Sequence, residues 1–305
     1  TSPSDPLALA RVPASLVVRE RVFDGAYALV LNKFPVFAGH ALLITPTFAR
    51  QADRLTKLDL DALHRCAVAA DGVGFYNSHD EAGSSQPHRH LQIVPFSSMA
   101  AVLSLTPSSP RTGGASAQLR PGMFWQFDLL PSEFWLWSAK APYLPVVRRL
   151  PALEARGVAH GVVRLPDRAT FELDFAPRGS TFADALVRAY VAVATDLGVL
   201  LSTAPEDAPH NVILVRHWLM VVKRRAKTST RGGVDCNALA FTGCLLVRDA
   251  GVFEVLTTSA AGMNTNATTP PGVAREPPPL LTPLDVLQDV ADSLGATSPP
   301  PRTLR

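Results

Sequence analysis

The chain has 305 residues, of which 47% are hydrophobic and 18% are charged, and its formal net charge is +3. Such a chain can bury a large core, which argues against overall disorder, and its small charge gives no reason to expect binding to nucleic acid or a membrane surface. Cys66, Cys236 and Cys244 form no CxxC pair, so we expect neither a disulfide framework nor a zinc knuckle.

The start of the chain carries no secretory signal pattern, and no apolar run is long enough to span a bilayer. We therefore expect a cytoplasmic protein without a membrane partner. Because the first residue is Thr1 rather than Met, targeting to an organelle stays open. Residues 1–15 are rich in proline and alanine and are expected to lie over the surface.

The first regular elements are predicted from short apolar runs. Residues 16–19 read as a strand, and residues 26–31 and 40–45 read as a hairpin whose loop carries Lys33. A helix is predicted over residues 58–70, because apolar side chains recur there at i, i+3, i+4 and i+7.

Residues 75–96 are the most informative stretch. They predict a strand, a polar loop containing Gly83, Ser84 and Ser85, and a second strand beginning near His88. Alternate side chains of a strand share one face, so His88 is expected to lie beside His90 and Gln92.

This register suits phosphoryl transfer. A neutral imidazole is a good nucleophile toward phosphorus and leaves readily from a phosphoramidate, so a histidine can split one transfer into two easier steps. Gln92 cannot titrate, but its amide can donate a hydrogen bond to a phosphoryl oxygen. The Gly83 loop could add backbone N–H groups near the phosphoryl oxygens on which negative charge develops. His88 would then be free to orient a neighbour or a leaving phosphate. The competing interpretations are structural histidines, or a zinc site that recruits ligands from residues 79–81.

The second half of the chain opens irregularly. Residues 97–131 are rich in proline and glycine signals, and the aromatic clusters at 123–125 and 134–137 favour core packing. A helix is predicted over residues 180–197, with Thr181 and Asp184 as a capping pair and Gly198 as its stop. Strands are expected at 159–165, 211–216, 218–222 and 245–247, a proline-rich linker at 266–283, a last helix at 283–294, and a disordered tail from residue 297.

The segment Glu81-Ala-Gly-Ser-Ser-Gln-Pro-His-Arg-His-Leu-Gln resembles the active-site motif of diadenosine tetraphosphate phosphorylases. These enzymes, also called ATP adenylyltransferases, belong to the histidine-triad and galactose-1-phosphate uridylyltransferase superfamily. The resemblance extends from about residue 16 to about residue 250 through Asn32-Lys-Phe-Pro-Val, Phe75-Tyr-Asn-Ser, His210-Asn-Val-Ile-Leu with Trp218, and Asn237-Ala-Leu-Ala-Phe-Thr-Gly.

The resemblance implies an α+β fold of the histidine-triad type, in which an antiparallel sheet with flanking helices is built from two intimately packed halves. We expect one continuous catalytic domain, with residues 1–98 as its N-terminal half, 99–150 as an irregular connection, 151–265 as its C-terminal half, and 266–305 as linker, terminal helix and tail.

The same resemblance implies a nucleotidyltransferase. His90 would take the adenylyl group from diadenosine tetraphosphate and expel ATP, and inorganic phosphate would accept that group to give ADP, with Gln92 and His88 assisting. The expected partners are these small molecules, with Mg²⁺ bound to the nucleotide and no tightly bound metal, and the protein is expected to be a monomer or a homodimer. The expected substrate-binding residues are Lys33, Asn77, Gly83, Ser84, Ser85, Gln86, Asn211, Arg224 and Asn237.

Three other functions stay open. One is a dinucleoside polyphosphate hydrolase, although histidine-triad hydrolases carry histidine at the position of Gln92. Another is a hexose-1-phosphate uridylyltransferase, although these enzymes commonly have proline between the two histidines and zinc-binding cysteines, which this chain lacks. A nucleotide-binding module without catalysis would tolerate loss of His90. The chain departs from the family at His210, where tyrosine is usual, and at Lys223, where proline is usual. Arg89 and His79 also differ, so substrate preference, including adenosine phosphosulfate, stays open.

Overall fold

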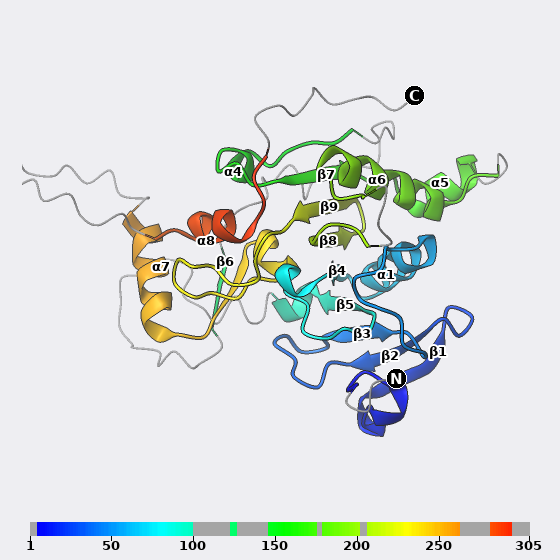
Figure 1. The fold of residues 1–305 in the computed structure, drawn as a ribbon. Helices are drawn as coiled ribbons and strands as arrows, with labels where there is room; N and C mark the ends of the chain where they lie inside the picture. Colours follow the sequence, from blue (N-terminus) through cyan, green and yellow to red (C-terminus); the bar gives the residue numbers. More distant parts are fainter. Residues whose placement is uncertain are drawn as a thin grey trace, which may run out of the picture.

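The computed structural model describes residues 5–99, 123–126, 146–175, 179–201, 206–262 and 281–294. Eight of the strands form one antiparallel sheet, in the order β1-β2-β3-β5-β4-β8-β9-β7 (Figure 1). These strands are β1 Val17–Val22, β2 Tyr27–Leu31, β3 Ala41–Ile44, β4 Gly72–Asn77, β5 His90–Pro95, β7 His160–Arg164, β8 His210–Val215 and β9 Trp218–Lys223.

One face of the sheet is covered by helices. Helix α1, Lys57–Ala69, packs on β4 and β5, helix α6, Phe182–Asp196, packs on β7 and β9, and α5, Arg168–Phe175, packs on α6. Both α1 and α6 begin at a threonine, Thr56 or Thr181, whose side chain forms a capping box with an aspartate three residues later. No helix in the described part of the chain is long and apolar enough to cross a membrane.

The opposite face is covered by C-terminal elements. The 3-10 helix η5, Ala238–Thr242, lies against β4 and β8, and strand β10, Cys244–Val247, pairs with β6, Met123–Gln126. Helices α4, Pro151–Glu154, α7, Ala250–Gly262, and α8, Pro283–Val290, complete this layer. Figure 1 shows α1, α5 and α6 on one side of the molecule and β6, α7 and α8 on the other.

The two halves share the sheet through one strand pair. β4 from the N-terminal half is hydrogen-bonded to β8 from the C-terminal half, and Asn77 lies opposite Asn211 at the end of this pair. Because β5 pairs with β4 on the side away from β8, the strand that carries His90 lies next to the junction.

Most predicted elements are confirmed, with the exception of both chain ends. The hairpin, the two long helices and the predicted strands are present, but the last helix ends at Val290 rather than at residue 294. Residues 1–15 were expected to lie over the surface, and the structure adds two features to this prediction. The segment forms the 3-10 helix η1, Leu9–Arg11, and begins η2, Ala14–Leu16, and its Asp5 is buried.

Helices α4, α5 and α7 were not predicted. The predicted aromatic cluster at 134–137, most of the linker at 266–283 and the tail from 297 lie outside the described residues, as do the side chains of 123–125. The four-part division of the chain stays a prediction.

Candidate active site

The loop between β4 and β5 carries the expected phosphate-binding residues. After β4 the chain forms a 3-10 helix, η3, Asp80–Ala82, and turns at Gly83, whose φ of +86° lies in the left-handed region. A Cβ atom at Gly83 would lie 2.6 Å from the carbonyl oxygen of Cys236. Both the backbone conformation and the close approach of the C-terminal half therefore require glycine at this position.

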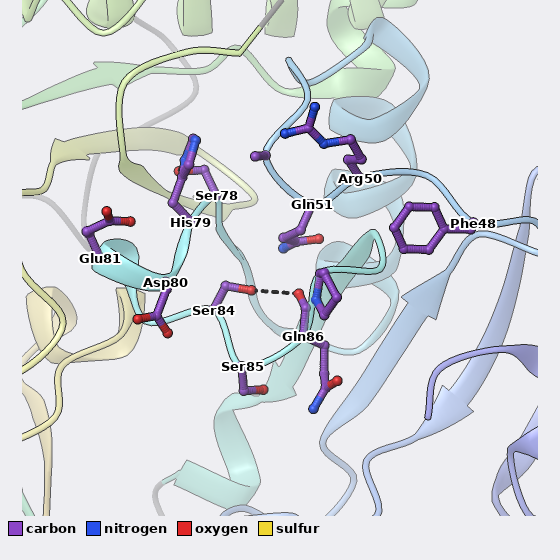
Figure 2. Close-up of a pocket in the computed structure, with 12 residues that line it drawn as sticks. Phe48, Arg50, Gln51, Ser78, His79, Asp80, Glu81, Ser84, Ser85 and Gln86 are labelled. Atoms are coloured by element: carbon purple, nitrogen blue, oxygen red, sulfur yellow. Dashed lines mark hydrogen bonds between the residues drawn. The ribbon is translucent and has the colours of Figure 1, made fainter. Parts of the chain in front are cut away.

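Ser84, Ser85 and Gln86 border a cavity of about 470 Å³. Figure 2 shows this loop facing Phe48 and Gln51. Ser84 is buried and its hydroxyl donates to the carbonyl oxygen of Gln86 at 3.0 Å, whereas Ser85 is exposed. Of the two serine side chains, that of Ser85 is thus the one accessible to a ligand.

His90 is held in a defined tautomer at the start of β5. Its Nδ1 lies 2.8 Å from the carbonyl oxygen of His88. A carbonyl oxygen can only accept, so Nδ1 carries the proton and Nε2 keeps its lone pair. Burial lowers the pKa of His90 below its usual value, which keeps the ring neutral at neutral pH. Gln51 fixes the backbone of His90, accepting from its N–H at 2.8 Å and donating to its carbonyl oxygen at 3.2 Å.

The His88 side chain is fully buried and engaged on both nitrogens. Nδ1 lies 2.8 Å from Asp5 Oδ2, and Nε2 lies 2.9 Å from both the hydroxyl and the carbonyl oxygen of Thr45. This corrects the expectation that His88 is free to orient a leaving phosphate, because neither nitrogen is available. His88 acts on the site through its carbonyl oxygen, which orients His90. Sequence reasoning missed Asp5, since nothing in its irregular segment marks it as a partner.

Gln92 lies on the same face of β5 as His90 and contacts a histidine from the hairpin. His40 Nε2 lies 3.1 Å from Gln92 Oε1, and Asn32 Nδ2 lies 3.1 Å from His40 Nδ1. His40 is buried, and burial lowers its pKa to about 4. The sequence analysis placed His40 at the start of a strand but not among the site residues, although it closes the hairpin loop that carries Lys33.

Asn77 and Asn211 lie inside the protein. Asn77 Oδ1 accepts from Asn211 Nδ2 at 2.8 Å and from the backbone N–H of Ala238 at 3.0 Å. The second N–H of the Asn211 amide donates to the carbonyl oxygen of Ala82 at 2.7 Å, directly before Gly83. Both side chains are buried, so they hold the Gly83 loop from inside the protein, through the carbonyl oxygen of Ala82.

Arg224 completes this buried network and corrects a prediction. A guanidinium has five N–H groups, and in Arg224 all of them face acceptors within the chain. The side chain is 2% exposed and rests on the ring of Phe241, so it does not reach substrate phosphates as expected. Burial lowers its pKa to about 10, which leaves it charged at neutral pH. The acceptors are Asn211 Oδ1 and the carbonyl oxygens of Ala82, Ala226, Cys236 and Val290.

Lys33 and Asn237 lie nearer to solvent. Lys33 is exposed, with its ammonium 5.4 Å from the ring centroid of Phe34. Asn237 is half-buried, caps η5 through its Oδ1 and lies against Gly83. Within the basic run at 223–227, Lys227 approaches the loop from its exposed side, since its ammonium lies 3.2 Å from Asp80 Oδ1. No group of three or more His, Cys, Asp or Glu side chains among the described residues is arranged to hold a metal ion.

Two family models match the chain. The model described as the Ap4A phosphorylase N-terminal domain matches residues 15–109, and the model described as the ATP adenylyltransferase C-terminal domain matches residues 157–267. Together they cover more than half of the chain. The chain belongs to the Ap4A phosphorylase family. The family resemblance of the sequence is thereby confirmed.

Two curated relatives of this Ap4A phosphorylase family member come from Saccharomyces cerevisiae. The chain is 28% identical over 252 residues to Diadenosine 5',5'''-P1,P4-tetraphosphate phosphorylase 2, a match that covers 77% of this chain and 66% of the relative. It is 27% identical over 245 residues to Protein APA1, with 76% and 64% covered. The chain thus spans about two thirds of the length of these relatives.

Solved structures have the same fold. The crystal structure of yeast Ap4A phosphorylase Apa2 matches with a TM-score of 0.64 and 24% identity, over 96% of this chain and 81% of that chain. The crystal structure of Apa2 in complex with Ap4A matches with a TM-score of 0.59 and 25% identity, over 83% and 76%. The expected α+β fold of this Ap4A phosphorylase family member is confirmed.

Proposed function

We propose that this chain is a nucleotidyltransferase that cleaves diadenosine tetraphosphate with inorganic phosphate to give ADP and ATP. The observation that carries the proposal is the 2.8 Å hydrogen bond from His90 Nδ1 to the carbonyl oxygen of His88, because it leaves Nε2 as a neutral nucleophile. The substrate is supported by the name of the curated relative and by the two Apa2 structures that are complexes, one with AMP and one with Ap4A.

In the first step, His90 Nε2 attacks the α-phosphorus of one adenosine. A P–N bond forms, the bond from this phosphorus to the bridging oxygen breaks, and ATP leaves with the electron pair on that oxygen. In the second step, an oxygen of inorganic phosphate attacks the same phosphorus, the P–N bond breaks and ADP is released. His90 returns to its neutral form with the lone pair on Nε2 restored.

The loop and its neighbours would bind the phosphate chain. The Ser85 hydroxyl would donate to phosphate oxygens, and the cavity beside Ser85 and Gln86 would hold the departing part of the chain. The expectation that the loop adds backbone N–H groups is corrected at Gly83 and Ser84, because their N–H groups donate to the carbonyl oxygens of Asp80 and His79. Lys33 would neutralise charge from the hairpin side. We assign Asn77, Asn211 and Arg224 to the support of this loop, and Asn237 to its flank. Mg²⁺ would arrive bound to the phosphates of the substrate.

The experiment uses the full chain and diadenosine tetraphosphate labelled on its α-phosphorus. A phosphoramidate survives alkali and is lost in acid, so protein-bound label is measured after an alkaline quench and again after acid. The variants are His90→Gly and, as a control, His217→Gln, whose side chain lies in the turn after β8, at the opposite end of that strand from Asn211.

We expect acid-labile label on the wild type and on His217→Gln, none on His90→Gly, and discharge of the label as ADP when phosphate is added. Release of AMP at the same rate with and without phosphate would show a hydrolase instead. Label that persists in His90→Gly would rule out His90 as the nucleophile.

A further inference from the structure

A chain of hydrogen bonds that begins at the backbone fixes the orientation of Asn32. The N–H of Phe34 lies 3.1 Å from Asn32 Oδ1. A backbone N–H can face only an acceptor, so this contact distinguishes the oxygen of the amide from its nitrogen. The Asn32 NH₂ group is therefore the group that faces His40 Nδ1, at 3.1 Å.

The orientation of Asn32 then determines the tautomer of His40. Because Nδ1 accepts from an amide, the ring proton must reside on Nε2, and Nε2–H donates to Gln92 Oε1 at 3.1 Å. The pKa of about 4 keeps the ring neutral, so it can accept on one nitrogen and donate on the other. The backbone of His40 is also fixed, since its N–H donates to the carbonyl oxygen of Phe37 and its own carbonyl accepts from Asn32.

The last member of the chain is the Gln92 amide. Its Oε1 is occupied by His40, so its NH₂ group is left to face a ligand, on the face of β5 that also carries His90. We propose that His40 is a positioning residue that holds the Gln92 amide with its NH₂ group toward the reacting phosphoryl oxygen. This inference rests on the proposed function.

The alternative orientation of Gln92 would be harmful to the reaction. A carboxamide turned by half a revolution presents its oxygen, and an oxygen facing a phosphoryl oxygen repels it instead of donating to it. Gln92 alone has no preference between the two orientations, because both ends of its amide have similar size and shape. A fixed donor beside His40 selects the productive one, and this preorganisation is in place before the substrate binds.

The kinetic test compares single-turnover labelling at saturating substrate in His40→Phe, His40→Gln and Gln92→Ala. Phenylalanine fills the space without a donor, whereas glutamine restores an N–H at about the position of Nε2. Loss of one oxyanion donor costs about 10²–10³-fold in rate, so we expect that loss for Gln92→Ala, about 10- to 10²-fold for His40→Phe, and recovery of most of the rate in His40→Gln.

The double variant His40→Phe/Gln92→Ala separates positioning from a general structural effect. If His40 acts through Gln92, His40→Phe adds little in the Gln92→Ala background. Multiplication of the two losses, or no rescue by His40→Gln, would overturn the inference.

A second measurement does not depend on activity. Nitrogen chemical shifts of ¹⁵N-labelled protein distinguish a protonated from an unprotonated ring nitrogen, and we expect the Nε2–H tautomer of His40 in the wild type without substrate. The Nδ1–H tautomer would overturn the inference. If the wild type forms no adenylyl-histidine, the proposed function fails, while this measurement still decides how Gln92 is oriented.

Discussion

Asn211 Nδ2 donates to Asn77 Oδ1 at 2.8 Å across the strand pair that joins the two halves of the sheet. Each half contributes one asparagine, and both side chains are buried. Asn211 also accepts from Arg224 at 2.6 Å. The strand pair that joins the halves and the buried side chains that hold the Gly83 loop therefore form one hydrogen-bonded network.

We expect Asn211→Ala to destabilise the protein strongly. The substitution leaves an N–H of Arg224 without its acceptor and removes a donor from Asn77 and from the carbonyl oxygen of Ala82, all of them buried. A buried polar group that loses its partner costs about 1–3 kcal/mol, and more when it is charged, so we expect a loss of about 3 kcal/mol in the free energy of unfolding. Urea unfolding measures it.

The control for this prediction is Asn237→Ala. Asn237 is half-buried and caps η5, and the loss of such a cap costs about 1 kcal/mol. Equal losses for the two variants would contradict the role of Asn211 as the centre of a buried network.

The contact between Asp5 and His88 gives a second prediction. Asp5→Ala removes the acceptor of His88 Nδ1 and leaves a buried N–H unpaired, which costs about 1–3 kcal/mol. Because the carbonyl oxygen of His88 orients His90, a displaced His88 also slows labelling of the protein by α-labelled substrate. Thermal unfolding and single-turnover labelling measure the two effects. Glu20→Ala on the exposed side of β1 should change neither, and unchanged labelling in Asp5→Ala would separate Asp5 from the site.

Local patterns in the sequence were sufficient for the elements that carry the site. The alternation in β5 placed His90 and Gln92 on one face, and Thr181 with Asp184 marked the start of α6. What the sequence could not provide are partners remote in the chain. Asp5 meets His88 across 83 positions, and His40 meets Gln92 across 52. No periodicity links such pairs. His40 meets Gln92 only after β3 pairs with β5, and Asp5 lies in no strand at all.

Burial of charge was the other property that could not be predicted. Arg224 stands in a run of basic residues, which favours a solvated or phosphate-binding interpretation. The structure instead surrounds it with carbonyl oxygens from the Gly83 loop, from the segment before η5 and from α8. Helix α7 was missed for a different reason. Its apolar sequence has no marked polar face, so its pattern matches the period of neither a helix nor a strand.

Gly83→Ala supplies a third prediction. The new Cβ would lie 2.6 Å from the carbonyl oxygen of Cys236, so the loop or the C-terminal half must shift, in addition to the strain of a positive φ. We expect single-turnover labelling to fall on the order of 10²-fold, as for the loss of an oxyanion donor. Gly157→Ala is the matched control, because Gly157 also has a positive φ of +67° but has nothing within 4 Å of its Cβ position. Similar losses of labelling in both variants would show that strain, and not the close approach, is the cause.

The last prediction concerns stability in acid and rests on His160. Its Nδ1–H donates to the carbonyl oxygen of Val158 at 2.8 Å, and its Nε2 accepts from the N–H of Leu150 at 2.6 Å, so only the neutral ring satisfies both contacts. Burial lowers its pKa to about 4, whereas a histidine in the unfolded chain titrates near 6.5. Between these values the unfolded state binds more protons than the folded state. The free energy of unfolding therefore falls as the pH falls through this window, and the pH dependence contributed by His160 fades as the pH rises beyond about 6.5.

The measurement is urea unfolding at several pH values between 7 and 4, on the wild type, His160→Gln and Leu153→Ala. Leu153 is a fully buried neighbour in α4 that does not titrate, so Leu153→Ala should lower the free energy of unfolding by a similar amount at every pH. His160→Gln removes the proton uptake, so its curve should approach that of the wild type as the pH falls. The full window corresponds to about 3 kcal/mol, at about 1.4 kcal/mol for each unit of pKa. Parallel curves for His160→Gln and the wild type would show that His160 does not stay neutral when the protein is folded.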